Sequence, residues 1–189
     1  MNTAWGDVAV HDAHAHLLSR NFFRLLAAQK SALAAAHPAG GHPAAEHADE
    51  APEKAIVAEL GWDLPPEDPA ELAARWVTEL DRHGIRKIAL MASLPGDEQS
   101  AAAARAAFPD RIHGYFMLNP LAEGAAERAE NAVENLGLQG ICLFPAMHGF
   151  SVQDERLRPI YELASGRKMV VFVHMGVLTV GLRGKLGLP

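Results

Sequence analysis

The chain has 189 residues, of which 49% are hydrophobic and 21% are charged, as is typical of a folded globular domain. Its 17 Lys and Arg against 23 Asp and Glu give a net charge of −6, which argues against a nucleic-acid or membrane partner, because such partners select a basic surface. The single cysteine excludes an intrachain disulfide, and the lack of a signal-peptide pattern or a long apolar stretch leads us to expect a cytoplasmic protein.

The predicted elements alternate between strands and helices. An apolar run predicts a first strand over residues 6–12, and a helix follows over residues 21–36 with Asn21 as its cap. Residues 37–52 are rich in Pro, Gly, Ala and His without an apolar period, which predicts a flexible loop. Further helices are predicted over residues 53–60, from the Asp68 cap to Gly84, and over residues 97–107, 122–135 and 153–165. Further strands are predicted over residues 85–91, 111–118, 138–144 and 169–174.

The spacing of these elements predicts an α/β protein with a parallel sheet. The later strands recur at intervals of about 25–30 residues with a helix between them, which is the size of a βαβ unit. Two architectures fit this pattern, a (β/α)8 barrel and an open doubly wound sheet. A complete barrel takes about 250 residues. The connection between the first two strands alone takes residues 17–84 here, so the barrel interpretation is a partial one.

Two histidines, separated by a single alanine, lie at the end of the first predicted strand. His14 and His16 point to the same face because side chains alternate along a strand, and Asp12 shares that face. His174 ends the last predicted strand. The carboxyl ends of parallel strands meet at one edge of the sheet, and three imidazoles with an open fourth position are the ligands of catalytic zinc. The spacing therefore predicts a metal site, with three unrelated histidines as the alternative.

Four segments resemble, in the same order, strand signatures of the amidohydrolase superfamily: residues 12–16, 115–120, 140–145 and 171–176. The branch that they resemble most is the amidohydrolase-related group that includes aminocarboxymuconate-semialdehyde decarboxylase. This resemblance implies one partial TIM-type (β/α)8 barrel domain over residues 1–189, with about five parallel strands, covering helices and an insertion between strands one and two. It also implies one divalent metal ion, most often zinc, held by His14, His16 and His174.

Several residues keep two interpretations. Cys142 stands where the two-metal branches of the superfamily carboxylate a lysine, which implies a single metal; the thiol is either a soft ligand or a small buried group. Asp12 either orients a ligand imidazole or binds backbone at the strand end. His148 either contacts substrate or faces solvent. Three histidines of the predicted loop also keep two interpretations: they either bind metal weakly or lie in a solvated loop. They are His37, His42 and His47.

The resemblance also implies groups that the 189 residues do not supply. The superfamily places a further histidine on strand six and, on strand eight, an aspartate that binds the metal and acts as the base. Neither strand is found, so we expect a catalytically incomplete fragment of a longer enzyme or a half-barrel that assembles with a partner. The exposed edges of strands one and five would then favour pairing with another chain, such as a homo-oligomer. Whether this chain is itself an enzyme stays open.

Three functions therefore follow from the sequence. The first is a metal-dependent hydrolase that attacks a C–N or C–O bond of a small-molecule substrate through metal-activated water. The second is a non-oxidative decarboxylase of the same family. The third is a non-catalytic metal- or ligand-binding α/β module. In either enzyme, the insertion between the first two strands leaves the active-site face and can act as a lid.

Overall fold

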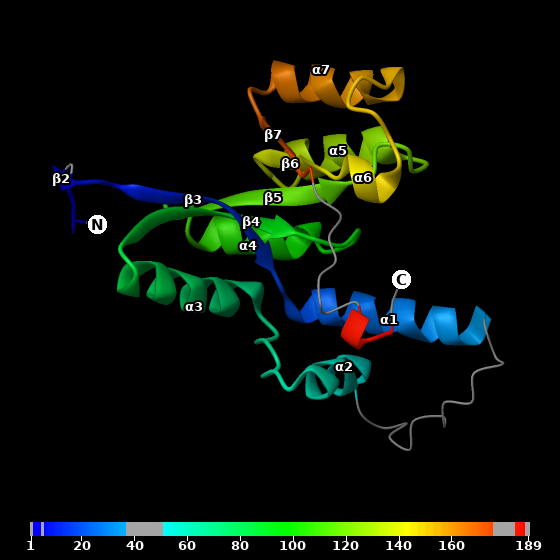
Figure 1. Ribbon diagram of the computed structural model, residues 1–189, viewed down its shortest axis with the longest axis horizontal. Helices are drawn as coiled ribbons and strands as arrows, with labels where there is room; N and C mark the ends of the chain where they lie inside the picture. The colour runs from blue at the N-terminus through cyan, green and yellow to red at the C-terminus, as the bar shows by residue number, and fades with distance from the viewer. Residues whose placement is uncertain (1, 5, 37–50, 176–183, 188–189) are drawn as a thin grey trace.

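The computed structural model describes residues 2–4, 6–36, 51–175 and 184–187 (Figure 1). Its main sheet has five parallel strands in the order β3-β4-β5-β6-β7. A short antiparallel ribbon, β1 (Asn2–Thr3) and β2 (Gly6–Asp7), precedes this sheet. The parallel strands are β3 (Val10–Leu17), β4 (Ile85–Ala92), β5 (Ile112–Leu118), β6 (Gly140–Leu143) and β7 (Val170–Val173).

The strand order distinguishes the two predicted architectures. Each strand pairs with the next one along the chain, without the reversal of order that a doubly wound sheet requires. The sheet is therefore part of a (β/α)8 barrel, as predicted, and the open doubly wound alternative is wrong. The described strands form a half-barrel with helices on its outside.

The helices also follow the prediction, with ends that differ by a few residues. Asp68 caps its helix as expected, accepting a hydrogen bond from the backbone N–H of Ala70 at 2.8 Å. Asn21 does not cap the first helix; the Ser19 hydroxyl does so, accepting from the N–H of Phe22 at 2.9 Å. The short α6 and the helical residues 184–185 have no counterpart in the prediction. The helices are α1 (Arg20–Ala36), α2 (Pro52–Leu60), α3 (Pro69–Arg82), α4 (Glu98–Ala107), α5 (Ala125–Glu134), α6 (Pro145–His148), the 3-10 turn η1 (Glu155–Leu157) and α7 (Arg158–Gly166).

The prediction placed the first strand too early. It begins at Val10 rather than at residue 6, and it runs on to Leu17. The reason is the parallel ladder with β4, in which His16 pairs with Met91 and Leu17 with Ala92, so that hydrogen bonding continues to the end of both strands. His14 and His16 thus lie inside β3, in its carboxyl-terminal half.

Alternation along the strands divides the sheet into two apolar faces. The outer face packs against α3, α4, α5 and α7 and includes Leu90, Phe116 and Ile141, all fully buried. The inner face carries a smaller group of apolar side chains, rich in sulfur atoms and aromatic rings, which we call the inner cluster. It consists of Ala89, Met91, Tyr115, Met117, Cys142 and Phe144, with Phe172 packed against it.

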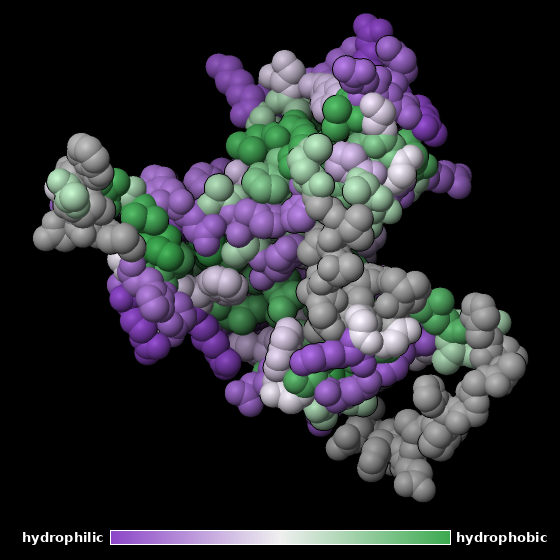
Figure 2. Space-filling view, viewed as in Figure 1, coloured by the Kyte–Doolittle hydropathy of each residue, from purple (hydrophilic) through white to green (hydrophobic). Residues whose placement is uncertain are grey.

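The last strand is only partly covered. Although its residues are all apolar, Val170 is 46% exposed and the other three are partly exposed. β7 is an edge strand of the described sheet, and it has a strand partner only in β6. Figure 2 shows apolar side chains at the surface in this part of the molecule.

The insertion after β3 forms a second, smaller core. Phe22, Phe23 and Leu26 of α1 pack against Ile56 and Val57 of α2, and Figure 1 shows these two helices side by side. Of the predicted loop over residues 37–52, residues 37–50 lie outside the described part of the chain. The single barrel domain over residues 1–189 stays a prediction.

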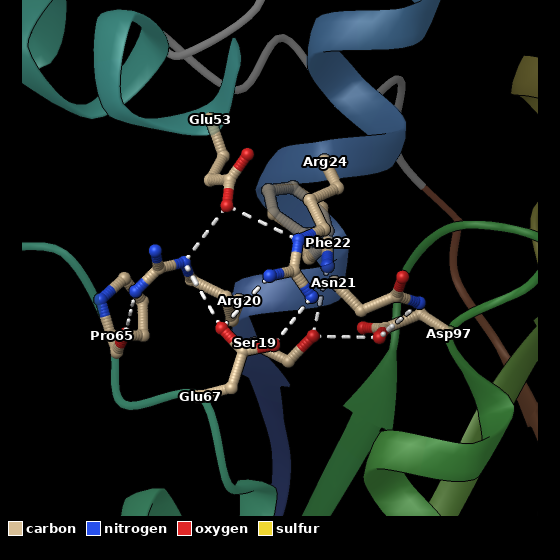
Figure 3. Close-up of polar contacts among 9 residues, drawn as sticks. All are labelled: Ser19, Arg20, Asn21, Phe22, Arg24, Glu53, Pro65, Glu67 and Asp97. Carbon is tan, nitrogen blue, oxygen red and sulfur yellow. Dashed lines mark hydrogen bonds and ion pairs between the residues drawn. The ribbon is translucent and has the colours of Figure 1, made fainter. Parts of the chain in front are cut away.

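Polar contacts fix this insertion to the barrel (Figure 3). The buried carboxylate of Glu53 accepts hydrogen bonds from Nε of Arg20 and of Arg24, both at 3.1 Å, and these ion pairs offset the cost of burying its charge. Ser19 donates its hydroxyl to Asp97 at 2.6 Å in the loop after β4. The start of α1 is thereby attached directly to the carboxyl edge of the sheet.

Candidate metal centre

The three histidines predicted as metal ligands lie together on the inner face. His14 and His16 project from the carboxyl-terminal half of β3, and His174 follows the last residue of β7. The ring centroid of His14 is 5.0 Å from that of His16 and 5.6 Å from that of His174. His14 is therefore the central member of the group, which we call the histidine cluster.

Two phenylalanines frame the histidine cluster. The ring of Phe172 stacks on His14, with 4.6 Å between centroids and 6° between planes. Phe144 stacks on His174 in a similar way, at 4.8 Å and 20°. These rings restrict the positions that the imidazoles can take and keep one side of each away from water.

The hydrogen bonding of the cluster fits a metal site. Both ring nitrogens of His14 and Nδ1 of His174 are buried without a hydrogen-bond partner. A buried polar atom without a partner costs about 1–3 kcal/mol, and a cation would remove that cost. Nitrogen donors of this kind suit zinc and similar divalent ions. Within the described ranges no three His, Cys, Asp or Glu groups are already arranged around a common point, so these rings would have to move to share an ion.

The electrostatics of the cluster favour the neutral form of two of its imidazoles, His14 and His16. Burial, together with the nearby His14 and His174, lowers the pKa of His16 to about 4. Burial and His174 also lower the pKa of His14, although Asp12 acts in the opposite direction. A neutral imidazole has the lone pair that metal binding requires, so His14 and His16 keep this capacity below neutral pH.

The structure decides between the interpretations of two other residues. Asp12 accepts a hydrogen bond from the backbone N–H of His14 at 3.0 Å, so it binds backbone at this position. Cys142 is fully buried in the inner cluster, where burial raises the pKa of its thiol to about 12. It is the small buried residue of the second interpretation and does not supply a thiolate.

His148 lies between its two predicted roles. It is half-buried at the end of α6, and its ring is near those of Phe144 and Phe150, at 6.3 and 6.4 Å between centroids. Its buried Nδ1 has no hydrogen-bond partner, and burial and the charge of Arg128 lower its pKa. The Nδ1 side of the ring therefore faces the protein, and neither role is decided. The loop histidines His37, His42 and His47 lie outside the described residues.

One contact of the cluster was not predicted. Nδ1 of His16 is 2.7 Å from Oγ of Ser93, the residue that follows β4. Nothing in the local sequence indicates this pair, because the two residues are 77 positions apart. Only the pairing of β3 with β4 brings them together.

Comparison with known proteins identifies the family. The amidohydrolase family model Amidohydro_2 matches residues 11–188. The chain belongs to the amidohydrolase family. The match includes all three members of the histidine cluster, and it agrees with the resemblance of the strand signatures. No curated protein sequence matches this amidohydrolase chain significantly.

Solved structures share the fold of this amidohydrolase chain at low sequence identity. The 5-carboxyvanillate decarboxylase of Sphingomonas paucimobilis has a TM-score of 0.57 and 16% identity, over 94% of this chain and 55% of that one. The enzyme of the same name from Novosphingobium aromaticivorans, solved with manganese and 3-methoxy-4-hydroxy-5-nitrobenzoic acid, has 0.51 and 18%, over 88% and 49%. An uncharacterised TIM-barrel protein of Bordetella bronchiseptica has 0.51 and 16%, over 90% and 57%.

The chain thus spans about half the length of the structures that it matches. At these identities the likeness shows the barrel fold and does not transfer a substrate. None of the helices in the described ranges has the length and apolar character that a membrane span requires.

Proposed function

We propose that His14, His16 and His174 bind one divalent metal ion, and that this chain supplies the metal-binding part of an amidohydrolase-type enzyme. The observation that supports this is the convergence of the three imidazoles, 5.0 and 5.6 Å apart from ring to ring, with three buried nitrogens that have no hydrogen-bond partner. Cys142, buried in the inner cluster, stands where the two-metal branches carry a carboxylated lysine, and this supports a site for one metal rather than two.

The reaction that we propose is hydrolysis of a C–N or C–O bond in a small-molecule substrate. When bound here, a divalent ion would lower the pKa of a water molecule toward neutrality and polarise a carbonyl oxygen of the substrate. The protein's own groups contribute neutral nitrogen donors and an apolar wall. Phe144 and Phe172 lie flat against two of the imidazoles and exclude water from those faces. Because the chain spans about half of the matched structures, the activity of the whole protein is part of the proposal.

Non-oxidative decarboxylation of an aromatic acid is the second candidate. Two of the similar structures are 5-carboxyvanillate decarboxylases, and one of them was solved with manganese and a nitrobenzoic acid. Aromatic side chains around the histidine cluster suit a flat aromatic substrate, since ring pairs attract when offset or edge to face. Manganese is accordingly the second metal to test after zinc.

Metal binding is tested by equilibrium dialysis of the purified chain against zinc, manganese and cobalt, followed by elemental analysis. We expect one ion per chain in the wild type and a large loss of affinity in His14→Ala. The matched control is His83→Ala, because His83 is 65% exposed at its side chain and lies outside the cluster. Absence of tight binding, or equal binding by His14→Ala, would reject the site.

The reaction class is tested on the metal-loaded protein with two sets of substrates. Amides, esters and lactones report hydrolysis through the acid that forms, whereas phenolic carboxylic acids report decarboxylation through release of carbon dioxide. Metal-dependent turnover of the first set, with none of the second, supports the hydrolase. The opposite pattern supports the decarboxylase, and metal binding without turnover of either set supports a non-catalytic role for this chain.

A further inference from the structure

Ser93 lies where the end of one strand meets the ligand face of the next. β3 and β4 are parallel neighbours, and in their register His16 pairs with Met91 and Leu17 with Ala92. Ser93 follows directly after Ala92. Side chains alternate along a strand, so Ser93 shares the inner face with Met91 and His16, and its Oγ is 2.7 Å from Nδ1 of His16.

The direction of this hydrogen bond follows from the single proton of a hydroxyl group. The same Oγ is 3.3 Å from the backbone oxygen of Met91, which can only accept. If the hydroxyl donates to Met91, its oxygen is free to accept from Nδ1–H of His16, and both hydrogen bonds form. If the hydroxyl donated to His16 instead, the contact with Met91 would be lost. The arrangement with two hydrogen bonds is the more stable one.

This direction assigns the tautomer of His16. A neutral imidazole carries one proton, so a proton on Nδ1 leaves the lone pair on Nε2. His16 differs in this respect from the other two histidines: both ring nitrogens of His14, and Nδ1 of His174, are buried without a partner. Among the described residues of the cluster, His16 is therefore the proposed ligand whose ring is held by a side-chain hydrogen bond.

We propose that Ser93 is a positioning residue for the metal site, which fixes the tautomer and the ring orientation of His16 so that Nε2 is ready to bind the ion. The inference rests on the proposed function, since the ion is the one proposed above. Partners of this kind, which hold the second nitrogen of a ligand histidine, typically change metal affinity by about 10- to 100-fold when they are removed.

Two measurements test the role of Ser93 separately from the metal site itself. The first is ¹⁵N NMR of the metal-free protein near pH 7.5, with the His16 signals assigned from a His16→Gln spectrum. We expect the Nδ1–H tautomer in the wild type and in Ser93→Thr, which keeps the hydroxyl, and a mixture of tautomers in Ser93→Ala. The second is zinc affinity, which we expect to fall about 10- to 100-fold in Ser93→Ala and to be retained in Ser93→Thr.

A matched control comes from another histidine whose Nδ1 has a side-chain hydrogen-bond partner. His113 is 3.0 Å from Oε1 of Gln139 through its Nδ1, outside the histidine cluster. Gln139→Ala removes that partner in the same way, and we expect zinc affinity to stay at the wild-type value.

The outcomes separate the two proposals. An Nε2–H tautomer of His16 in the wild type, or equal zinc affinity of Ser93→Ala and the wild type, overturns the role of Ser93 and leaves the metal site intact. Failure of the wild type to bind zinc, with the Nδ1–H tautomer still present, rejects the proposed function and leaves the positioning contact intact. Because the tautomer is read in the wild type, the test does not depend on whether Ser93→Ala folds.

Discussion

His14 and Phe172 stack ring on ring, at 4.6 Å between centroids, although they lie on the two outer strands of a five-stranded sheet. This contact requires the sheet to curl until the inner faces of β3 and β7 meet. The curvature brings His174 to His14 as well. The candidate metal centre is thus assembled by the curvature of the half-barrel rather than by neighbouring strands.

Phe172→Ala is the variant that tests this relationship. Removing the ring leaves His14 without its stacking partner, so we expect weaker metal binding as well as a loss of about 2–3 kcal/mol in the free energy of unfolding, because the side chain is only partly buried. Phe108→Ala is the control, since Phe108 is also partly buried but packs on the outer face. Zinc titration and urea denaturation measure the two effects; equal metal affinity in both variants would contradict the role of the stack.

The pH dependence of stability follows from His16. Burial and the adjacent His14 and His174 lower its pKa to about 4 in the folded protein, against about 6.5 in an unfolded chain. The unfolded state therefore takes up a proton first as pH falls, and the free energy of unfolding of the metal-free protein should decrease from about pH 6.5 to about pH 4. Above about pH 6.5, His16 does not make the free energy of unfolding depend on pH.

His16→Gln does not titrate at this position, so its stability should fall less steeply across the same pH window. Urea denaturation at a series of pH values measures the slopes. The exposed His83→Gln should retain the wild-type slope, and a His16→Gln slope equal to that of the wild type would show that His16 is not the responsible group.

Much of the fold could be predicted because its signals are local. The Asp68 cap and the alternation of His14 and His16 each depend on a few consecutive residues, and the βαβ pattern depends only on the order and spacing of such elements along the chain. The first cap shows the limit of such signals: Ser19 and Asn21 are both good caps, and the structure uses Ser19 while the amide of Asn21 donates to the oxygen of Gly96. That choice depends on the loop after β4, which is far away in sequence.

The same limit applies to the site. The three histidines could be found from their strand positions, but the stack of Phe172 on His14 depends on sheet curvature and the Ser93 contact depends on strand register. Neither is encoded in a short motif. The late end of β3 has the same cause, since the ladder with β4 extends the strand through the histidines.

Glu53 holds the insertion together through its two arginine partners. The carboxylate is buried, and Glu53→Gln would remove the buried counter-charge of Arg20 and Arg24 and leave them only the exposed carboxylate of Glu67. We expect a loss of about 3 kcal/mol in stability, or selective loss of amide protection in α2 if the insertion unfolds by itself. Glu59→Gln, which removes an exposed ion pair with Lys30, should cost less than about 1 kcal/mol. Equal effects of both variants in hydrogen exchange and urea denaturation would contradict this account.

Gly140 is required by a close approach on the inner face. A Cβ at this position would lie 2.4 Å from the ring of Tyr115, so Gly140→Ala forces the ring or the strand to move. We expect a loss of about 1–3 kcal/mol in the free energy of unfolding, measured by urea denaturation. Gly166→Ala has no atom within 4 Å of the added carbon and should be neutral or slightly stabilising. A neutral Gly140→Ala would show that this face tolerates a wider spacing.

The central claim is that His14, His16 and His174 share one divalent ion, and cobalt titration followed by visible absorption tests it most directly. We predict one cobalt ion per wild-type chain with the absorption bands of a nitrogen-ligated site, and loss of those bands in each of His14→Ala, His16→Ala and His174→Ala but not in His83→Ala. Wild-type bands that persist in any of the three cluster variants, or a wild type that binds no cobalt, would contradict the shared site.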